Sequence, residues 1–183
     1  MKMILLIAPL LALGCLTAGL YGMLHNQISY TVSPDYFHQF KFIQFRIDPA
    51  WQNRWGASLV GWHASWWMGL LIGIVIVPIG TIVPGTRPYV VAVLRAYGVV
   101  ALTALVIGLG ALAYAYATVD PTTVGVVTRF EHPITDPVAF MRAGTMHNFS
   151  YLGGLLGIAT GAYWLTLERR WSAAMNRPAR RKS

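Results

Sequence analysis

Four long runs of apolar residues divide the chain, and none alternates apolar with polar positions as a strand of a membrane β-barrel would. Each run is long enough for a helix to cross the hydrocarbon core of a bilayer, which takes about 20 residues. A helix also satisfies its own backbone hydrogen bonds, as lipid requires. The pattern predicts an all-α membrane protein, a bundle of four transmembrane helices over Met3–Leu24, Ser58–Val83, Val90–Thr118 and Phe149–Leu167.

The composition agrees with a membrane setting. Of the 183 residues, 56% are hydrophobic and only 11% are charged. A soluble domain carries roughly 25% charged residues. The composition therefore points to lipid as the environment of most of the chain.

The basic residues predict how the chain is oriented. Two long connections join the apolar runs, at 25–57 and 119–146. Their acidic side chains balance their basic ones, so these connections are the candidates for the external side. The remaining basic residues lie at the N-terminus, in connection 84–95 and in the tail: Lys2, Arg87, Arg95, Arg169, Arg170, Arg177, Arg180, Arg181 and Lys182. The positive-inside rule then places both termini in the cytoplasm. The basic tail suits anionic lipid rather than nucleic acid, because it follows a span directly.

The first residues allow a second interpretation. A lysine, an apolar run and small residues before Cys15 resemble a bacterial lipoprotein signal. The segment after Cys15 stays apolar as far as Leu24, whereas a mature lipoprotein turns polar there. We therefore expect the segment to remain as the first helix, with lipidation of Cys15 as the alternative.

One short frame occurs twice. The stretches DPAWQNRWG (48–56) and DPVAFMRAG (136–144) share Asp-Pro, an arginine and a glycine at the same spacing, 88 residues apart. Thr-Val-x-Pro also recurs, at 31–34 and 118–121. These matches predict two parallel repeats of helix, external loop and helix, related by a pseudo-twofold axis along the membrane normal. The predicted organisation is a first repeat over 1–83, a second over 84–168 and a cytoplasmic tail over 169–183.

Each position of the frame has a local role. Asp48 and Asp136 can cap the helix that follows, and a proline suits its first turn. Arg54 and Arg142 can then reach lipid phosphate or a loop carboxylate at the outer surface. Small residues at four-residue spacing predict close helix packing: Gly14, Ala18 and Gly22, then Gly69 and Gly73, then Gly153, Gly157 and Gly161.

Residues that are not repeated are better candidates for a site. His25, His63 and His147 lie at or in the outer ends of the spans, where ionisable groups are costly. Imidazole binds transition metals and haem iron, so these three are the candidate ligands of such a cofactor. The alternative is that each histidine hydrogen-bonds a neighbouring backbone group or tyrosine. HNQISY and HNFSY look alike but fall out of register in the repeat, so the likeness is interpreted as coincidence.

The tryptophans are the other unusual feature. Trp51, Trp55, Trp62 and Trp66 would share one face of the second span. This face could be a packing seam or an aromatic wall for a flat cofactor, to which Trp62, Trp66 and Tyr151 would contribute. Tyr151 occupies the position of His63 in the second copy.

The first external loop is aromatic enough to cover the bundle or to contact a partner. Its residues 40–45 permit either a short strand or an interfacial helix. The run HNQISYTVSPDYFHQFKFIQF is similar to a segment of uncharacterised bacterial multi-pass membrane proteins. The likeness covers mostly this segment and the start of the second span. It implies a bacterial inner-membrane setting and no particular activity.

Two functions from different classes follow. The first is a binding or sensing module with an external pocket between the repeats, which holds a transition metal, haem or another flat cofactor. The second is an accessory or assembly subunit whose partners are membrane lipids, other membrane subunits or a second copy of the chain. An enzyme ranks lower, because no nucleophile–base pair is visible within a span. A transporter ranks lowest, because the spans lack paired acids.

Overall fold

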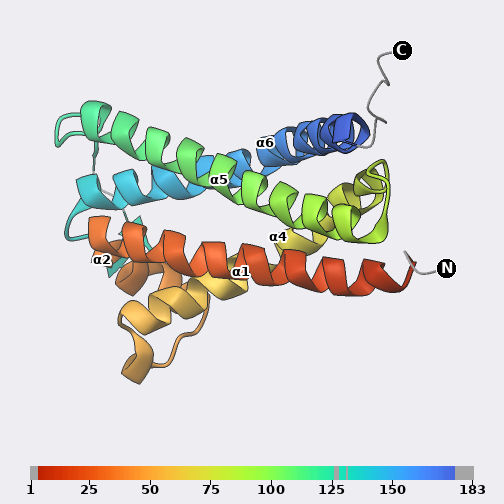
Figure 1. The fold of residues 1–183 in the computed structure, drawn as a ribbon. Coiled ribbons are helices and arrows are strands. Elements are labelled where there is room, and N and C mark those ends of the chain that lie inside the picture. The colour runs from red at the N-terminus through yellow and green to blue at the C-terminus, as the bar shows by residue number, and fades with distance from the viewer. Residues whose placement is uncertain (1–3, 126–127, 131, 176–183) are drawn as a thin grey trace, which may run out of the picture.

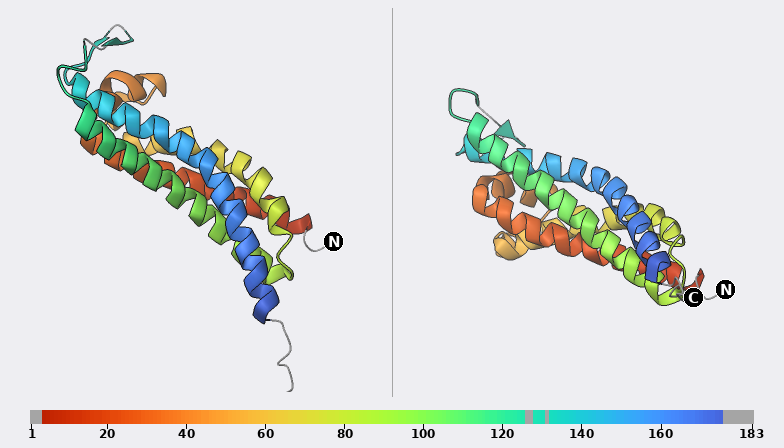
Figure 2. Two further views of the ribbon diagram at one scale, coloured as in Figure 1. Left: turned by 90° about the horizontal axis from the view of Figure 1, so that it is seen from above. Right: turned by 45° about the horizontal axis from the view of Figure 1, so that its top comes forward.

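The computed structural model describes residues 4–125, 128–130 and 132–175. In these residues four long helices form the body of the molecule (Figures 1 and 2). They are α1 (Ile7–Val32), α4 (Arg54–Gly80), α5 (Thr86–Thr118) and α6 (Pro137–Met175). The 3-10 turn η1 (Ile4–Leu6) leads into α1. Helix α1 packs chiefly on α4, and α5 packs chiefly on α6.

The start of α1, the connection from α4 to α5 and the end of α6 lie at one end of the bundle (Figure 1). The opposite end carries the segments between α1 and α4 and between α5 and α6. The first of these is mostly helical, with α2 (Pro34–Tyr36), the π-helix η2 (Phe37–Lys41), α3 (Phe42–Gln44) and the 3-10 turn η3 (Pro49–Trp51). The second contains a short antiparallel pair, β1 (Thr128–Arg129) and β2 (His132–Pro133).

The helical conformation of residues 37–44 resolves the choice between strand and helix in the aromatic loop. Tyr36, Phe37 and Phe42 are buried and form a small core with residues of α4 and α6. The Asp35 carboxylate joins the two end segments, because its Oδ2 accepts hydrogen bonds from the backbone amides of Thr135 at 3.0 Å and Asp136 at 3.1 Å. The loop therefore covers the bundle mouth.

Three helices are long and apolar enough to cross a membrane: Ile4–Val32, Arg54–Gly80 and Thr86–Thr118. The protein is thus helical and compatible with a membrane, as predicted. The fourth predicted span, Phe149–Leu167, lies inside α6, which does not reach the same apolarity over the described residues. Glycine, hydroxyl and aromatic residues dilute the apolar side chains of this helix.

Several boundaries differ from the prediction because polar residues continue a helix. Helix α1 runs to Val32, although the apolar run ends at Leu24. The polar residues of its last turns, among them Asn26 and Ser29, are buried against neighbouring helices. Helix α6 likewise continues to Met175, so residues 169–175 of the predicted tail are helical. The rest of that tail, 176–183, lies outside the described residues.

The two copies of the frame begin their helices differently. Asp136 caps α6, and its Oδ1 accepts a hydrogen bond from the Ala139 amide at 2.9 Å. Asp48 accepts instead from the Ala50 amide and starts η3. Helix α4 then begins at Arg54, and its cap is Asn53. The prediction that Asp48 caps the second span is therefore wrong, because η3 intervenes.

Glycines allow the closest helix contact. A side chain at Gly61 would overlap the backbone carbonyl of Gly22, and one at Gly69 would overlap that of Gly14. Helices α1 and α4 therefore touch backbone to backbone at two levels. Between α5 and α6, a Cβ atom at Gly153 would lie 2.8 Å from the Ala104 Cα atom. The predicted small-residue packing is confirmed at these contacts, where dispersion rather than the hydrophobic effect joins helices in lipid.

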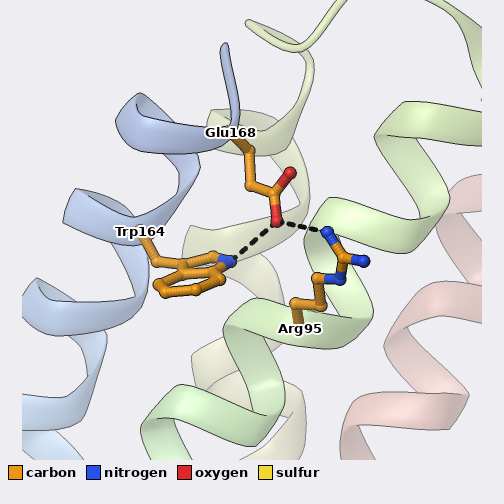
Figure 3. A network of polar contacts seen from close by, with 3 residues as sticks. All are labelled: Arg95, Trp164 and Glu168. Carbon is orange, nitrogen blue, oxygen red and sulfur yellow. Dashed lines mark hydrogen bonds and ion pairs between the residues drawn. The ribbon is translucent and has the colours of Figure 1, made fainter. Parts of the chain in front are cut away.

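A polar cluster fastens α5 to α6 near the end that holds the start of α1 (Figure 3). The Glu168 carboxylate accepts hydrogen bonds from Arg95 Nη1 at 2.9 Å and from Trp164 Nε1 at 3.1 Å. Glu168 is buried, whereas the Arg95 side chain is more than half exposed. The pair positions the two helices, and solvent or headgroups screen its charge.

Candidate functional site

A cavity of about 80 Å³ lies among α1, α4, α5 and α6. Its middle is lined by apolar side chains such as Met68, Ile72 and Val100. One end is polar, and the hydrogen-bonding residues gathered there include His25, Asn26, Lys41, His147, Ser150 and Tyr151. A water molecule needs about 10–15 Å³ on the same scale. The cavity therefore has room for several waters or for part of an organic molecule.

Two histidines and two serines join α1 to α6 in a crossed arrangement. Ser150 Oγ on α6 lies 2.9 Å from His25 Nε2 on α1. Ser29 Oγ on α1 lies 3.0 Å from His147 Nε2 on α6. Each serine follows the histidine of its own helix by about one turn, and the two helices are antiparallel. Each helix therefore presents one histidine and one serine to the other, and all four residues are buried.

Asn26 orients His25. The Asn26 side-chain amide donates to the Ala57 carbonyl on α4 at 2.9 Å, which leaves its oxygen as an acceptor. That oxygen lies 3.3 Å from His25 Nδ1. The arrangement assigns the proton of neutral His25 to Nδ1. His25 Nε2 then accepts a hydrogen bond from the Ser150 hydroxyl.

The segment after α1 covers the polar end of the cavity. The ring of Tyr36 stacks on that of His147 with centroids 4.8 Å apart. The His147 ring meets the His25 ring edge to face at 4.6 Å. Lys41 closes the same end from the π-helix η2. Such helices are rare and often occur at functional sites.

Lys41 is the cation of the site. Its Nζ atom donates to Gln44 Oε1 at 3.0 Å and lies 4.3 Å from the centroid of the Phe40 ring. Burial, followed by the positive charge of Arg129, lowers the pKa of Lys41 to about 8. Lys41 is therefore mostly charged at pH 7 and mostly neutral above pH 9.

Tyr21 places a buried hydroxyl group in the lining of the cavity. It lies one turn before His25 on α1, and the two rings are 5.8 Å apart. The Tyr21 hydroxyl is buried and forms no well-aligned hydrogen bond within the part of the chain that the structure describes, although the Ser150 hydroxyl lies close to it. A buried unpaired hydroxyl costs on the order of 1–3 kcal/mol. Since Tyr21 lines the cavity, a bound molecule could satisfy this group.

The predicted site residues divide into two sets. His25, His147 and Tyr151 line the cavity together. His63, Trp62 and Trp66 do not line it. His63 lies two residues after Gly61, which faces α1, and two residues turn a helix by about 200°. His63 is therefore exposed, and its Nδ1 lies 2.7 Å from the Leu59 carbonyl oxygen.

The tryptophan face is also different from the prediction. Trp51 belongs to η3 and not to α4, so it does not share a helix face with the others. Trp62 packs against α1 at Gly19, while Trp55 and Trp66 are 70% and 42% exposed. The face points mostly outward and forms neither a seam along its whole length nor a wall of the cavity.

The described residues contain no group of three histidine, cysteine or acidic side chains that could hold a metal ion. The Nε2 atoms of His25 and His147 already pair with serines. The two rings also meet edge to face, whereas two imidazoles on opposite sides of one haem iron point their nitrogens at each other.

Sequence reasoning missed Ser29, Ser150, Asn26, Tyr21 and Lys41. A signal for some of them was present in the likeness of HNQISY and HNFSY, which was interpreted as coincidence. One segment belongs to α1 and the other to α6, and the two pair with each other in the structure. Their register in the repeat is therefore irrelevant to this pairing.

Comparison with known proteins identifies no family for the chain. No family model matches the sequence, and neither a curated protein nor a solved structure shows significant similarity to it.

Proposed function

We propose that the chain is a four-span protein of the bacterial inner membrane that binds an amphipathic organic molecule in the cavity between α1 and α6. The bacterial setting follows from the resemblance of the external loop. The basic residues support cytoplasmic termini. Arg87 lies in the first turn of α5 and Arg169 lies near the end of α6, and both helix ends are at the bundle end where α1 starts (Figure 1).

The packing of α6 supports the fourth span. Helix α6 lies beside α5 and connects the two ends of the bundle (Figure 2). If α5 crosses the bilayer, its antiparallel neighbour crosses it too. The glycines that lower the apolarity of α6 are the ones that let it approach α5.

Two equivalent arginine contacts support the repeat. Arg54 Nη1 donates to Thr31 Oγ1 at 3.1 Å, and Arg142 Nη2 donates to the Val119 carbonyl at 2.8 Å. In each copy the arginine reaches back 23 residues to the end of the preceding long helix. The frame thus ties the outer ends of each helix pair in both halves.

The observation that carries the binding proposal is the cavity itself, which is polar at one end and apolar along its length, with the buried Tyr21 hydroxyl in its lining. The polar end lies about 10 Å from the end of α1, at 1.5 Å per residue from His25 to Val32. An apolar tail would lie among Met68, Ile72 and Val100, with its head group at the histidines. Small-molecule sites have this composition, apolar walls with a few convergent polar groups.

The charges indicate the type of head group. Lys41 lines the cavity, whereas no acidic side chain among the described residues lines it. The tyrosine hydroxyl groups of Tyr21 and Tyr151 in the lining can donate hydrogen bonds. A head group with acceptor oxygens, anionic near Lys41, fits this lining. An organic ligand fits better than a metal ion, because the donor set lacks a third metal-binding side chain.

Filling the cavity should remove the ligand without disturbing the bundle. A Cβ atom at Gly154 would meet only Met68 Cε, at 3.9 Å, so Gly154→Leu extends into the open space. Gly110 is the matched control, because nothing lies within 4 Å of a Cβ atom there. The wild-type full chain and each variant are purified from membranes in mild detergent. The lipid-soluble molecules that remain bound are then extracted with organic solvent and quantified by mass spectrometry.

We expect one molecular species enriched in the wild type and in Gly110→Leu, and reduced about tenfold or more in Gly154→Leu. Equal retention in both variants would contradict binding in the cavity. If the wild type retains nothing beyond bulk membrane lipid, the accessory-subunit function becomes the better proposal.

Binding of an anionic head group should weaken as Lys41 loses its proton. With a pKa of about 8, Lys41 is charged at pH 7 and neutral at pH 9.5. A fluorescent alkyl sulfonate keeps its charge across this range and serves as the probe. We expect its affinity to fall about fivefold from pH 7 to pH 9.5, because a partly exposed charged contact contributes on the order of 1 kcal/mol. Lys41→Arg should abolish the fall, and an unchanged pH dependence in Lys41→Met would contradict the assignment.

A further inference from the structure

The side chains at the polar end of the cavity also form a potential reaction centre. Ser150, His25 and Asn26 stand in sequence, with 2.9 Å between Ser150 Oγ and His25 Nε2 and 3.3 Å between His25 Nδ1 and Asn26 Oδ1. All three line the cavity. We propose that Ser150 is a nucleophile that attacks the ester of an acyl lipid, with His25 as general base. This inference rests on the binding of an amphipathic molecule in the same cavity.

The protonation of His25 suits this role. Asn26 cannot rotate its amide freely, because its nitrogen donates to the Ala57 carbonyl. His25 therefore keeps its proton on Nδ1 and offers the lone pair of Nε2 to the Ser150 hydroxyl. Catalytic centres of this kind share one arrangement: the nucleophile is hydrogen-bonded to a base, and a third group orients that base. Asn26 acts through His25 and is a positioning residue.

The side chain of Ser150 lines the cavity and packs against α5. A Cβ atom at Gly108 on α5 would overlap Ser150 Oγ, so the absence of a side chain there makes space for the hydroxyl. Ser150 Oγ hydrogen-bonds to His25, and the Tyr21 hydroxyl lies close to it. Tyr21, one turn before His25, holds the buried hydroxyl that lacks a well-aligned partner in the described chain. That hydroxyl can donate to the oxyanion that forms when an ester is attacked.

The second serine–histidine pair lacks these features. Ser29 is fully buried and does not line the cavity. Its hydroxyl lies within 3.4 Å of the carbonyls of His25 and Asn26 as well as near His147. His147 Nδ1 has no orienting partner among the described residues. The Ser29–His147 pair is therefore a helix–helix contact.

The reaction balances with water as the second reactant. Ser150 Oγ bonds to the ester carbon, and its proton passes to His25 Nε2. The ester C–O bond then breaks, and the alcohol leaves with the proton from His25. Water attacks the acyl-serine, with His25 taking its proton. That proton returns to Ser150 Oγ as the fatty acid leaves, and the acid releases its own proton to solvent.

The test uses a long-chain alkyl fluorophosphonate on the full chain in mild detergent. Ser150 Oγ would displace fluoride from phosphorus, and the labelled peptide is identified by mass spectrometry. We expect labelling at Ser150, lost in Ser150→Ala and reduced about 100-fold or more in His25→Gln, as removal of a general base predicts. Thr145→Ala, at a position of α6 that does not line the cavity, should be labelled at the wild-type rate.

Labelling at another serine, or equal loss in Thr145→Ala and His25→Gln, would overturn the proposal. Absent labelling while the Gly154→Leu comparison still shows a retained ligand would also overturn it, and would leave the binding function standing. Mapping on the wild type decides the matter even if Ser150→Ala does not fold.

Discussion

Replacing Gly61 by alanine should lower the Tm of the bundle sharply, although it adds only one methyl group. The new Cβ atom would overlap the Gly22 carbonyl and lie 2.9 Å from the backbone nitrogen of Met23. These are backbone atoms of α1, so no rotamer change can relieve the overlap. The helices must separate, and overpacking of this kind costs about 1–3 kcal/mol.

The matched control is Gly98→Ala on α5, where nothing lies within 4 Å of the added atom. Alanine favours a helix over glycine by about 1 kcal/mol, so this variant should be as stable as the wild type or more so. Thermal unfolding in one detergent, followed by size-exclusion chromatography, measures both. Equal Tm values for the two variants would show that α1 and α4 do not meet at Gly61.

Cysteine labelling should be all or none at the two ends of the bundle. Thr123, beyond α5, and Thr86, at the start of that helix, are both exposed. With the native Cys15 replaced by alanine, Thr123→Cys in intact cells should react fully with an impermeant maleimide. Thr86→Cys should react only after the membrane is opened, because the positive-inside rule predicts that this end lies on the cytoplasmic side.

The reverse pattern would place the termini outside and the polar end of the cavity on the cytoplasmic face. Labelling of both positions in intact cells would mean that α5 does not cross the membrane. Thr17→Cys, within α1, is a useful third position, since a residue in the bilayer should resist the reagent on either side.

Much of the architecture could be predicted from apolarity, because the four long helices follow the four apolar runs. The ends of α1 could not be predicted in this way. Its last turns contain Asn26 and Ser29, which look like loop residues until their partners on α4 and α6 are known. Hydropathy measures one segment at a time and contains no information about such contacts.

The site was predictable only in part, for a similar reason. His25 and His147 stood out as ionisable residues near apolar runs, and the fold brings them together. His63 stood out equally, but its direction depends on which face of α4 the glycines turn toward α1. Ser150 and Tyr21 are ordinary residues in a helix, and only the pairing of distant helices makes them part of a cavity.

A crystal structure of the full chain grown from a lipid phase would be the sharpest test of ligand binding between α1 and α6. We expect elongated density in the cavity, with an apolar part beside Met68 and a polar end within hydrogen-bonding distance of the Tyr21 hydroxyl. The crossed pairs of His25 with Ser150 and of His147 with Ser29 should frame that polar end. A closed bundle with side chains filling the space, or His25 and His147 turned to separate outer faces, would contradict the proposed function.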